Sequence, residues 1–160
     1  MPISSEPVAQ LVLADIAATL ALIAGAPSYF STVRKVLVPG FTPFSANEYP
    51  AIAIVPEGTT DDQTEIHYVQ ATRWDLTIIG ILSGRDAVPL SILRLVRDIH
   101  FALMLDPRRG NTAGNAHAVD TKWLGWTPIP PADDADELAF VECRIQVVFR
   151  TSDTDMTVQA

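Results

Sequence analysis

The chain has 160 residues, of which 48% are hydrophobic, and a formal charge of -8 at pH 7. This length suits one compact domain with a real core and leaves little room for two. The acidic balance argues against a nucleic-acid surface, because neutralising phosphates takes clustered Lys and Arg. Cys143 is the single cysteine and cannot form an internal disulfide, so folding in the cytoplasm is expected.

The apolar run from Val8 to Ala24 raises the question of a membrane span or an export signal. Asp15 would sit near the middle of a span, at a cost of about 2.5–3.5 kcal/mol on insertion scales. No Lys or Arg precedes Arg34, which disfavours a signal peptide, although Leu22–Ala26 resembles a small-residue cleavage site. A buried helix is the preferred interpretation.

The first predicted helix runs from about Glu6 to Ala24. Ser4 or Ser5 can cap it, Pro7 suits its opening turn, and Gly25-Ala26-Pro27 ends it. Its large apolar residues point in several directions, so part of its surface is expected to be covered by something other than this chain's core. These residues are Leu11, Leu13, Ile16, Leu20 and Ile23.

Two short strands and one long strand are predicted next. The short ones are Phe30–Val38 and Ala51–Val55, the second stopped by Pro56 and Gly58. An acidic loop then leads to the long strand, about Ile66–Leu82, whose side chains alternate between apolar and polar.

The second predicted helix, about Asp86–Leu105, has a clear amphipathic pattern, with Arg94 and Asp98 one turn apart on its polar side. The segment Arg108–His117 is small, polar and Gly-containing, and is predicted to be a long flexible loop.

Two more strands, about Ala118–Pro128 and Leu138–Thr151, complete the pattern, the last with the cleanest alternation in the chain. The predicted fold is therefore α+β: a mostly antiparallel sheet of four to five strands with two main helices packed on one face. Residues 1–152 are assigned to this domain and residues 153–160 to a polar, flexible tail.

No catalytic or metal-binding motif is recognised, and no cofactor is predicted. The three histidines, His67, His100 and His117, lack ligand spacing, and Cys143 falls on an inward strand face where a thiol is inert. Two acidic clusters lack the ligand pattern of a calcium loop and are interpreted as solvated turns. They comprise Glu57, Asp61, Asp62 and Glu65, and Asp133, Asp134, Asp136 and Glu137.

Aromatic and basic residues in loops and near strand ends are the candidate contacts with other proteins, because such groups often anchor interfaces. For the Arg108-Arg109 pair, stabilisation of a helix end and pairing with an acidic neighbour both remain open. The candidates are Phe41, Phe44, Tyr49, Arg108, Arg109, Asn111, His117, Trp123 and Trp126.

Taken together, several sequence segments resemble those of the tail terminator proteins of long-tailed bacteriophages. They are the apolar N-terminal helix, the strand Tyr49–Glu57, the long strand with Trp74 and Leu76, the helix ending in Ala102-Leu103-Met104-Leu105-Asp106, the loop from Arg109-Gly110, and the last strand closing on Phe149-Arg150-Thr151. The resemblance spans nearly the whole chain and rests on element order and short phrases.

The resemblance implies a non-enzymatic virion protein that assembles in the cytoplasm of the infected bacterium. It would form a homo-oligomeric, hexameric ring on the head-proximal end of the tail tube, stop polymerisation of the tube protein and present a surface to a head connector or neck protein. DNA would pass through the lumen only as cargo, which the acidic surface would suit. No membrane partner is implied. Two alternatives stay open. One is another neck component, a head-completion or adaptor protein, and the other is a small enzyme or ligand-binding domain that uses His67 or His117 with a nearby carboxylate.

Overall fold

A computed structural model describes residues 7–38, 45, 47–62, 69–83, 89–110, 117–129, 138–152 and 155–159. Its helices are α1 (Val8–Ala21) and α2 (Pro89–Leu105). Its strands are β1 (Lys35–Leu37), β2 (Ala51–Asp62), β3 (Val69–Ser83), β4 (Asp120–Ile129), β5 (Leu138–Ser152) and β6 (Asp155–Gln159).

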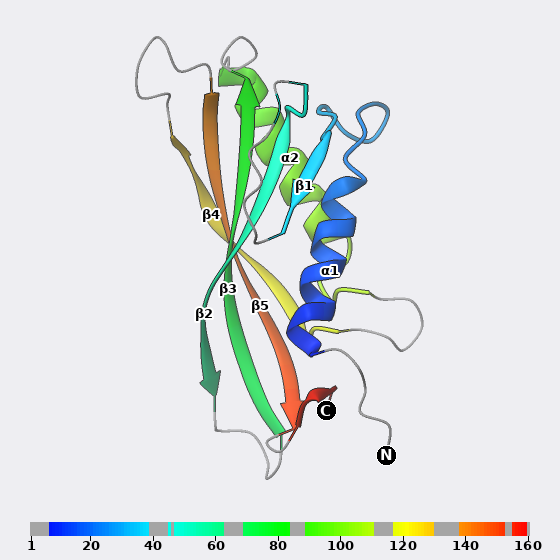
Figure 1. Ribbon diagram of the computed structural model, residues 1–160, viewed down its shortest axis with the longest axis vertical. Helices are drawn as coiled ribbons and strands as arrows, with labels where there is room; N and C mark the ends of the chain where they lie inside the picture. The colour runs from blue at the N-terminus through cyan, green and yellow to red at the C-terminus, as the bar shows by residue number, and fades with distance from the viewer. Residues whose placement is uncertain are drawn as a thin grey trace.

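The strands form one twisted, elongated sheet with both helices on one side of it (Figure 1). The order is β1-β2-β3-β5-β4, and β6 also pairs with β5. Among the described strands, β1–β2 is the only parallel pairing. β3 and β5 pair over their whole length, from Val69 opposite Ser152 to Ser83 opposite Leu138. This arrangement confirms the predicted α+β fold.

The side chains of β5 alternate between the two faces of the sheet, and the apolar ones point to the side that the helices cover. Cys143, Ile145 and Val147 are fully buried there, and their partners Ile78, Leu76 and Trp74 on β3 share that face. α2 buries Leu95, Ile99 and Leu103 against this surface, as its periodicity predicts.

α1 buries a single stripe, made of Val8, Val12, Ile16 and Leu20 at intervals of four residues. The excess apolar surface predicted for this helix is not fully covered. Leu11 and Leu13 are half-buried, and Leu22, just after the helix, is 70% exposed. Among the described residues, no helix has the length and apolar composition needed to span a bilayer.

β2 extends further than predicted. The prediction ended it before Pro56, because proline lacks an N–H, yet the strand continues to Asp62 after a register shift between Pro56 and Thr59. β1 pairs only with Ala51–Ala53, so beyond Ala53 this strand lies at the sheet edge, where proline is tolerated. The Trp74 indole N–H donates to the Glu57 carbonyl at 3.2 Å and holds the bulge in place.

Two other elements also differ from prediction. The strand expected over Phe30–Val38 is reduced to β1, because the preceding residues form a turn that hydrogen-bonds to α2. The tail expected to be flexible after Ser152 contains β6, which pairs with β5 at Thr151 and Ser152. Short polar segments such as these carry little periodicity, so long-range pairing decides their conformation.

We expect Gly80→Ala to lower the free energy of unfolding by about 1–3 kcal/mol, because an added methyl group would overpack the core. A Cβ at Gly80 would lie 2.8 Å from both Leu95 Cδ2 on α2 and Val141 Cγ1 on β5. Gly58→Ala is the matched control, since a Cβ there meets nothing within 4 Å, and it should change stability by less than about 0.5 kcal/mol. Urea denaturation of both variants would test this, and equal effects would contradict the close approach of α2.

Candidate interaction surfaces

The predicted interface residues do not converge on one site. Arg108 and Trp126 are exposed, whereas Tyr49, His117 and Trp123 are half-buried. Phe41, Phe44 and Asn111 lie outside the described residues, as does His67.

Trp123 and Trp126, both predicted to be interface residues, lie on edge strand β4 in different surroundings. The Trp123 ring packs edge-to-face on His100 of α2, with ring centroids 4.9 Å apart, so it belongs to the contact between helix and sheet. Trp126 lies beyond a bulge at Gly125, is opposite Cys143 in register, and stays 40% exposed. Leu124 and Ile129 on the same strand are 50% and 39% exposed. The last part of β4 therefore exposes apolar side chains on both faces, with Trp126 on the face of Cys143 and Ile129, opposite Phe140, on the other.

Arg109 was predicted as an interface candidate, but its guanidinium is fully buried within its own chain. It donates to the carbonyl of Leu103 at the end of α2, and its Nη1 lies 3.6 Å from Asp15 Oδ2 on α1. Arg109 thus both bonds the end of α2 and pairs with an acidic residue, the two roles that the sequence left open. The acidic residue belongs to the same chain. The exposed Arg108 beside it stays an interface candidate.

The cost of burying Asp15 and Arg109 is offset only in part by their attraction to each other. Burial raises the pKa of the Asp15 carboxyl, and attraction to Arg109 opposes this only in part. Burial likewise lowers the pKa of Arg109, against the opposing effect of Asp15 and Asp106. Within the described residues, Nε and Nη1 of Arg109 and Oδ2 of Asp15 have no hydrogen-bond partner. Arg109 also has a φ of 53°, a left-handed conformation common just after a helix.

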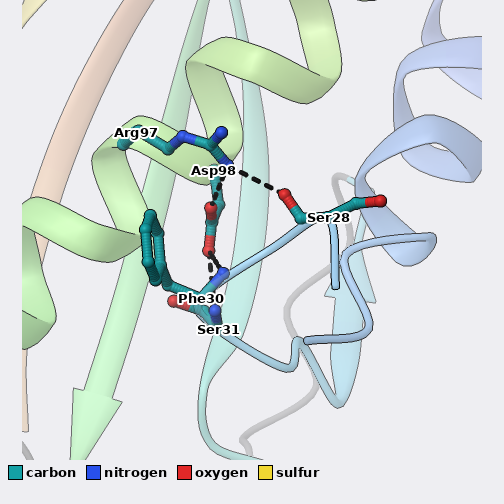
Figure 2. Close-up of polar contacts among 5 residues, drawn as sticks. All are labelled: Ser28, Phe30, Ser31, Arg97 and Asp98. Atoms are coloured by element: carbon teal, nitrogen blue, oxygen red, sulfur yellow. Dashed lines mark hydrogen bonds and ion pairs between the residues drawn. The ribbon is translucent and has the colours of Figure 1, made fainter. Parts of the chain in front are cut away.

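Asp98 forms a second buried charge network (Figure 2). It was predicted to lie on the polar side of its helix, yet it is fully buried. Its Oδ2 accepts the backbone N–H groups of Phe30 at 2.8 Å and Ser31 at 2.6 Å, while Oδ1 accepts Arg97 Nη1 at 3.0 Å. The same Nη1 donates to the Ser28 carbonyl at 2.9 Å. These bonds fix the turn before β1 onto α2.

The Phe30 side chain projects from this fixed turn and is 64% exposed. The guanidinium carbons of Arg97 and Arg94 lie 5.2 and 5.7 Å from its ring centroid. A shallow pocket beside the ring is also lined by Ser31, Thr32 and Ser91, with Pro50 and Leu82 completing it. Sequence reasoning missed this site; the only local signal was an aromatic pair between two serines, Ser28-Tyr29-Phe30-Ser31.

The described groups that could support catalysis mostly make contacts that hold the fold, although His117 lies near enough to Asp15 to oppose the raised pKa of that carboxyl. Burial raises the pKa of the Cys143 thiol to about 12, so it stays protonated at neutral pH and is a poor nucleophile. His100 contacts Trp123, and the backbone N–H of His117 donates to the Arg109 carbonyl at 2.8 Å. No group of three or more His, Cys, Asp or Glu residues in the described part of the chain is placed to hold a metal ion. The Phe30 pocket contains no histidine.

Comparison with known proteins identifies a similar fold. No family model and no curated protein matches the chain. A solved structure titled "Virion of native gene transfer agent (GTA) particle" contains a chain that superposes with a TM-score of 0.54 and 16% sequence identity. The match covers 91% of this chain and 92% of that one. The two chains therefore share a fold over nearly their whole lengths.

Removing one member of the Asp15–Arg109 pair should have unequal effects. We expect Asp15→Leu to destabilise the protein by about 3–5 kcal/mol, because it leaves a fully buried guanidinium with only the weaker attraction of Asp106. Arg109→Met should cost less, since the Asp15 side chain is 23% exposed and can be hydrated. The double variant should recover most of the loss, because an apolar pair of similar volume needs no compensation. Thermal and urea unfolding of the three variants would measure this, and strictly additive losses would refute the coupling.

Proposed function

We propose that this protein is a structural component of a phage-like particle, and specifically its tail terminator. In this role a ring of subunits, hexameric in the family that the sequence resembles, caps the head-proximal end of the tail tube. The ring stops addition of tube protein and offers its other side to a head connector or neck protein. DNA crosses the ring as cargo, and the chain carries out no reaction.

The observation that carries this proposal is the fold shared with a chain of a gene transfer agent virion over 91% of this chain. That likeness is independent of the short sequence phrases on which the resemblance to tail terminators rests. The exposed Trp126 side chain on edge strand β4 supports a role in assembly, because exposed aromatic residues often anchor protein contacts. The protonated, buried Cys143 thiol and the lining of the Phe30 pocket, which contains no histidine, favour a non-enzymatic role.

Deletion of the gene from the phage or prophage that encodes it tests the proposal directly. We expect lysates that contain tails of uncontrolled length and heads without tails, because nothing would stop tube polymerisation. Negative-stain electron microscopy measures the distribution of tail lengths, and the wild-type gene supplied from a plasmid is the control. Tails of normal length would reject the terminator role. Binding of purified protein to emptied heads but not to tail tubes would instead identify another neck component.

The β4 edge can be tested by one substitution in the same assay. We expect Trp126→Lys to abolish complementation of the deletion, because a charge replaces the exposed aromatic side chain on this edge strand. The fold should persist, which a thermal unfolding curve near that of the wild type would verify. Thr60→Lys is the matched control, since Thr60 is exposed on β2, on the other side of the sheet from β4. Normal tails from the Trp126→Lys variant would exclude this edge from assembly.

A further inference from the structure

We propose that the pocket beside Phe30 is a docking site for an acidic segment of a second copy of this chain. The second copy is the neighbour that the proposed ring would supply, so the choice of occupant rests on the proposed function. The pocket itself is argued from its own geometry and charge.

The pocket combines a cation, hydroxyl groups and apolar walls. The Arg94 guanidinium lies at its rim beside the Phe30 ring, with Ser31, Thr32 and Ser91 supplying hydroxyl groups. Pro50 and Leu82 form apolar walls. A carboxylate can accept hydrogen bonds from a guanidinium and hydroxyls together, while a neighbouring apolar side chain covers the aromatic ring. The chemistry therefore fits a peptide in which carboxylates alternate with apolar residues.

The pocket is held in shape before any partner arrives. Figure 2 shows the buried Asp98 carboxylate between α2 and the turn, with the Phe30 ring beside Arg97. Both N–H groups of the turn bond to that carboxylate, so the backbone of Phe30 and Ser31 is fixed. Arg97 is fixed in turn by Asp98 and the Ser28 carbonyl, and its guanidinium carbon lies 4.5 Å from the Phe101 ring centroid. An aromatic side chain that is already ordered loses little conformational entropy on binding.

Charge complementarity identifies the occupant. Asp98 is the one acidic residue of α2 and is buried, so the exposed charged side chains of this helix are Arg94 and Arg97. The chain as a whole carries -8, so a second copy offers carboxylates to this basic surface. Its densest acidic stretch is residues 129–138, Ile-Pro-Pro-Ala-Asp-Asp-Ala-Asp-Glu-Leu, which has carboxylates, prolines and no cation. Prolines pack well on aromatic rings, and carboxylates pair with arginine.

A nucleic acid is the less favoured occupant. Arginine, hydroxyls and an aromatic ring can also hold a phosphate and stack on a base. A chain with a net charge of -8 repels a polyanion, however, and Arg97 is already bonded to Asp98. A short acidic peptide carries far less charge and needs only the one cation at the pocket rim.

Peptide binding to the full-length protein tests the inference without any tail assembly. The probe is a capped, fluorescently labelled peptide of residues 129–138, and the matched control peptide has Asn or Gln at each acidic position. We expect saturable binding of the acidic peptide, measured by fluorescence anisotropy, that weakens as salt increases. Arg94→Glu should weaken binding by at least about tenfold through like-charge repulsion, and Phe30→Ala should also reduce it.

Lys122→Glu is the matched protein control, because Lys122 is exposed on edge strand β4 and does not line the pocket, so this variant should bind the peptide as the wild type does. Thermal unfolding confirms that each variant is folded. Absence of peptide binding, equal binding of the neutral peptide, or unchanged binding by Arg94→Glu would overturn the inference. So would tighter binding of a labelled oligothymidine than of the peptide. Imaging of the deletion phage stands apart from this test, so failure of either proposal is recognisable without the other.

Discussion

The buried carboxylate of Asp98 fixes the path of the chain between its first helix and its first strand. The residues after α1 have no helix or strand of their own until β1, apart from a bridge between Ala24 and Thr32. Their backbone N–H groups at Phe30 and Ser31 bond to Asp98, and the N–H of Val33 bonds to the Ile23 carbonyl at 2.8 Å. A charged acceptor strengthens such bonds, and its loss would leave buried donors unsatisfied.

That constraint joins the two helices to the sheet edge. β1 follows the anchored turn and pairs with the first residues of β2, so the position of the turn sets the start of the sheet. The Asp15–Arg109 pair forms a second connection, between α1 and the chain leaving α2. The fully buried Asp98 carboxylate accepts three hydrogen bonds, whereas Oδ2 of the half-buried Asp15 carboxylate has no hydrogen-bond partner among the described residues. The backbone at Phe30 is therefore held firmly by hydrogen bonds, whereas the charges of Asp15 and Arg109 are only partly compensated by the groups around them.

The sequence predicted the elements whose pattern is set by burial on one face. β3, β5 and α2 agree with their predicted ranges to within a few residues where they are described, because regular alternation or helical spacing extends over many residues. Pro56 made the predicted strand end too early. β2 tolerates this proline because β1 pairs only with Ala51–Ala53, which leaves Pro56 at the sheet edge, and the sequence does not show how short that pairing is.

The site was less predictable than the fold for a physical reason. Asp98 at helical spacing from Arg94 indicates a solvated face, and only a distant turn that supplies two N–H groups makes its burial favourable. Arg109 presents the same difficulty, because its partner Asp15 lies on another helix. Phe30 has no periodic neighbours to identify it. Contacts between residues far apart in sequence leave no local pattern.

The bulge at Gly125 has a consequence for how this protein meets other chains. β4 is an outer strand with exposed apolar side chains, which is the usual template for uncontrolled sheet extension. Its Gly125 adopts a φ of 130°, which side-chain-bearing residues rarely reach, and Pro128 near its end has no N–H to donate. The register shift beside Gly125 interrupts the regular spacing of backbone groups along the strand, and Pro128 supplies no N–H, so a foreign strand would find a less regular edge to pair with. This edge can therefore contact other chains through its side chains while it is poorly suited to extension of the sheet by added strands.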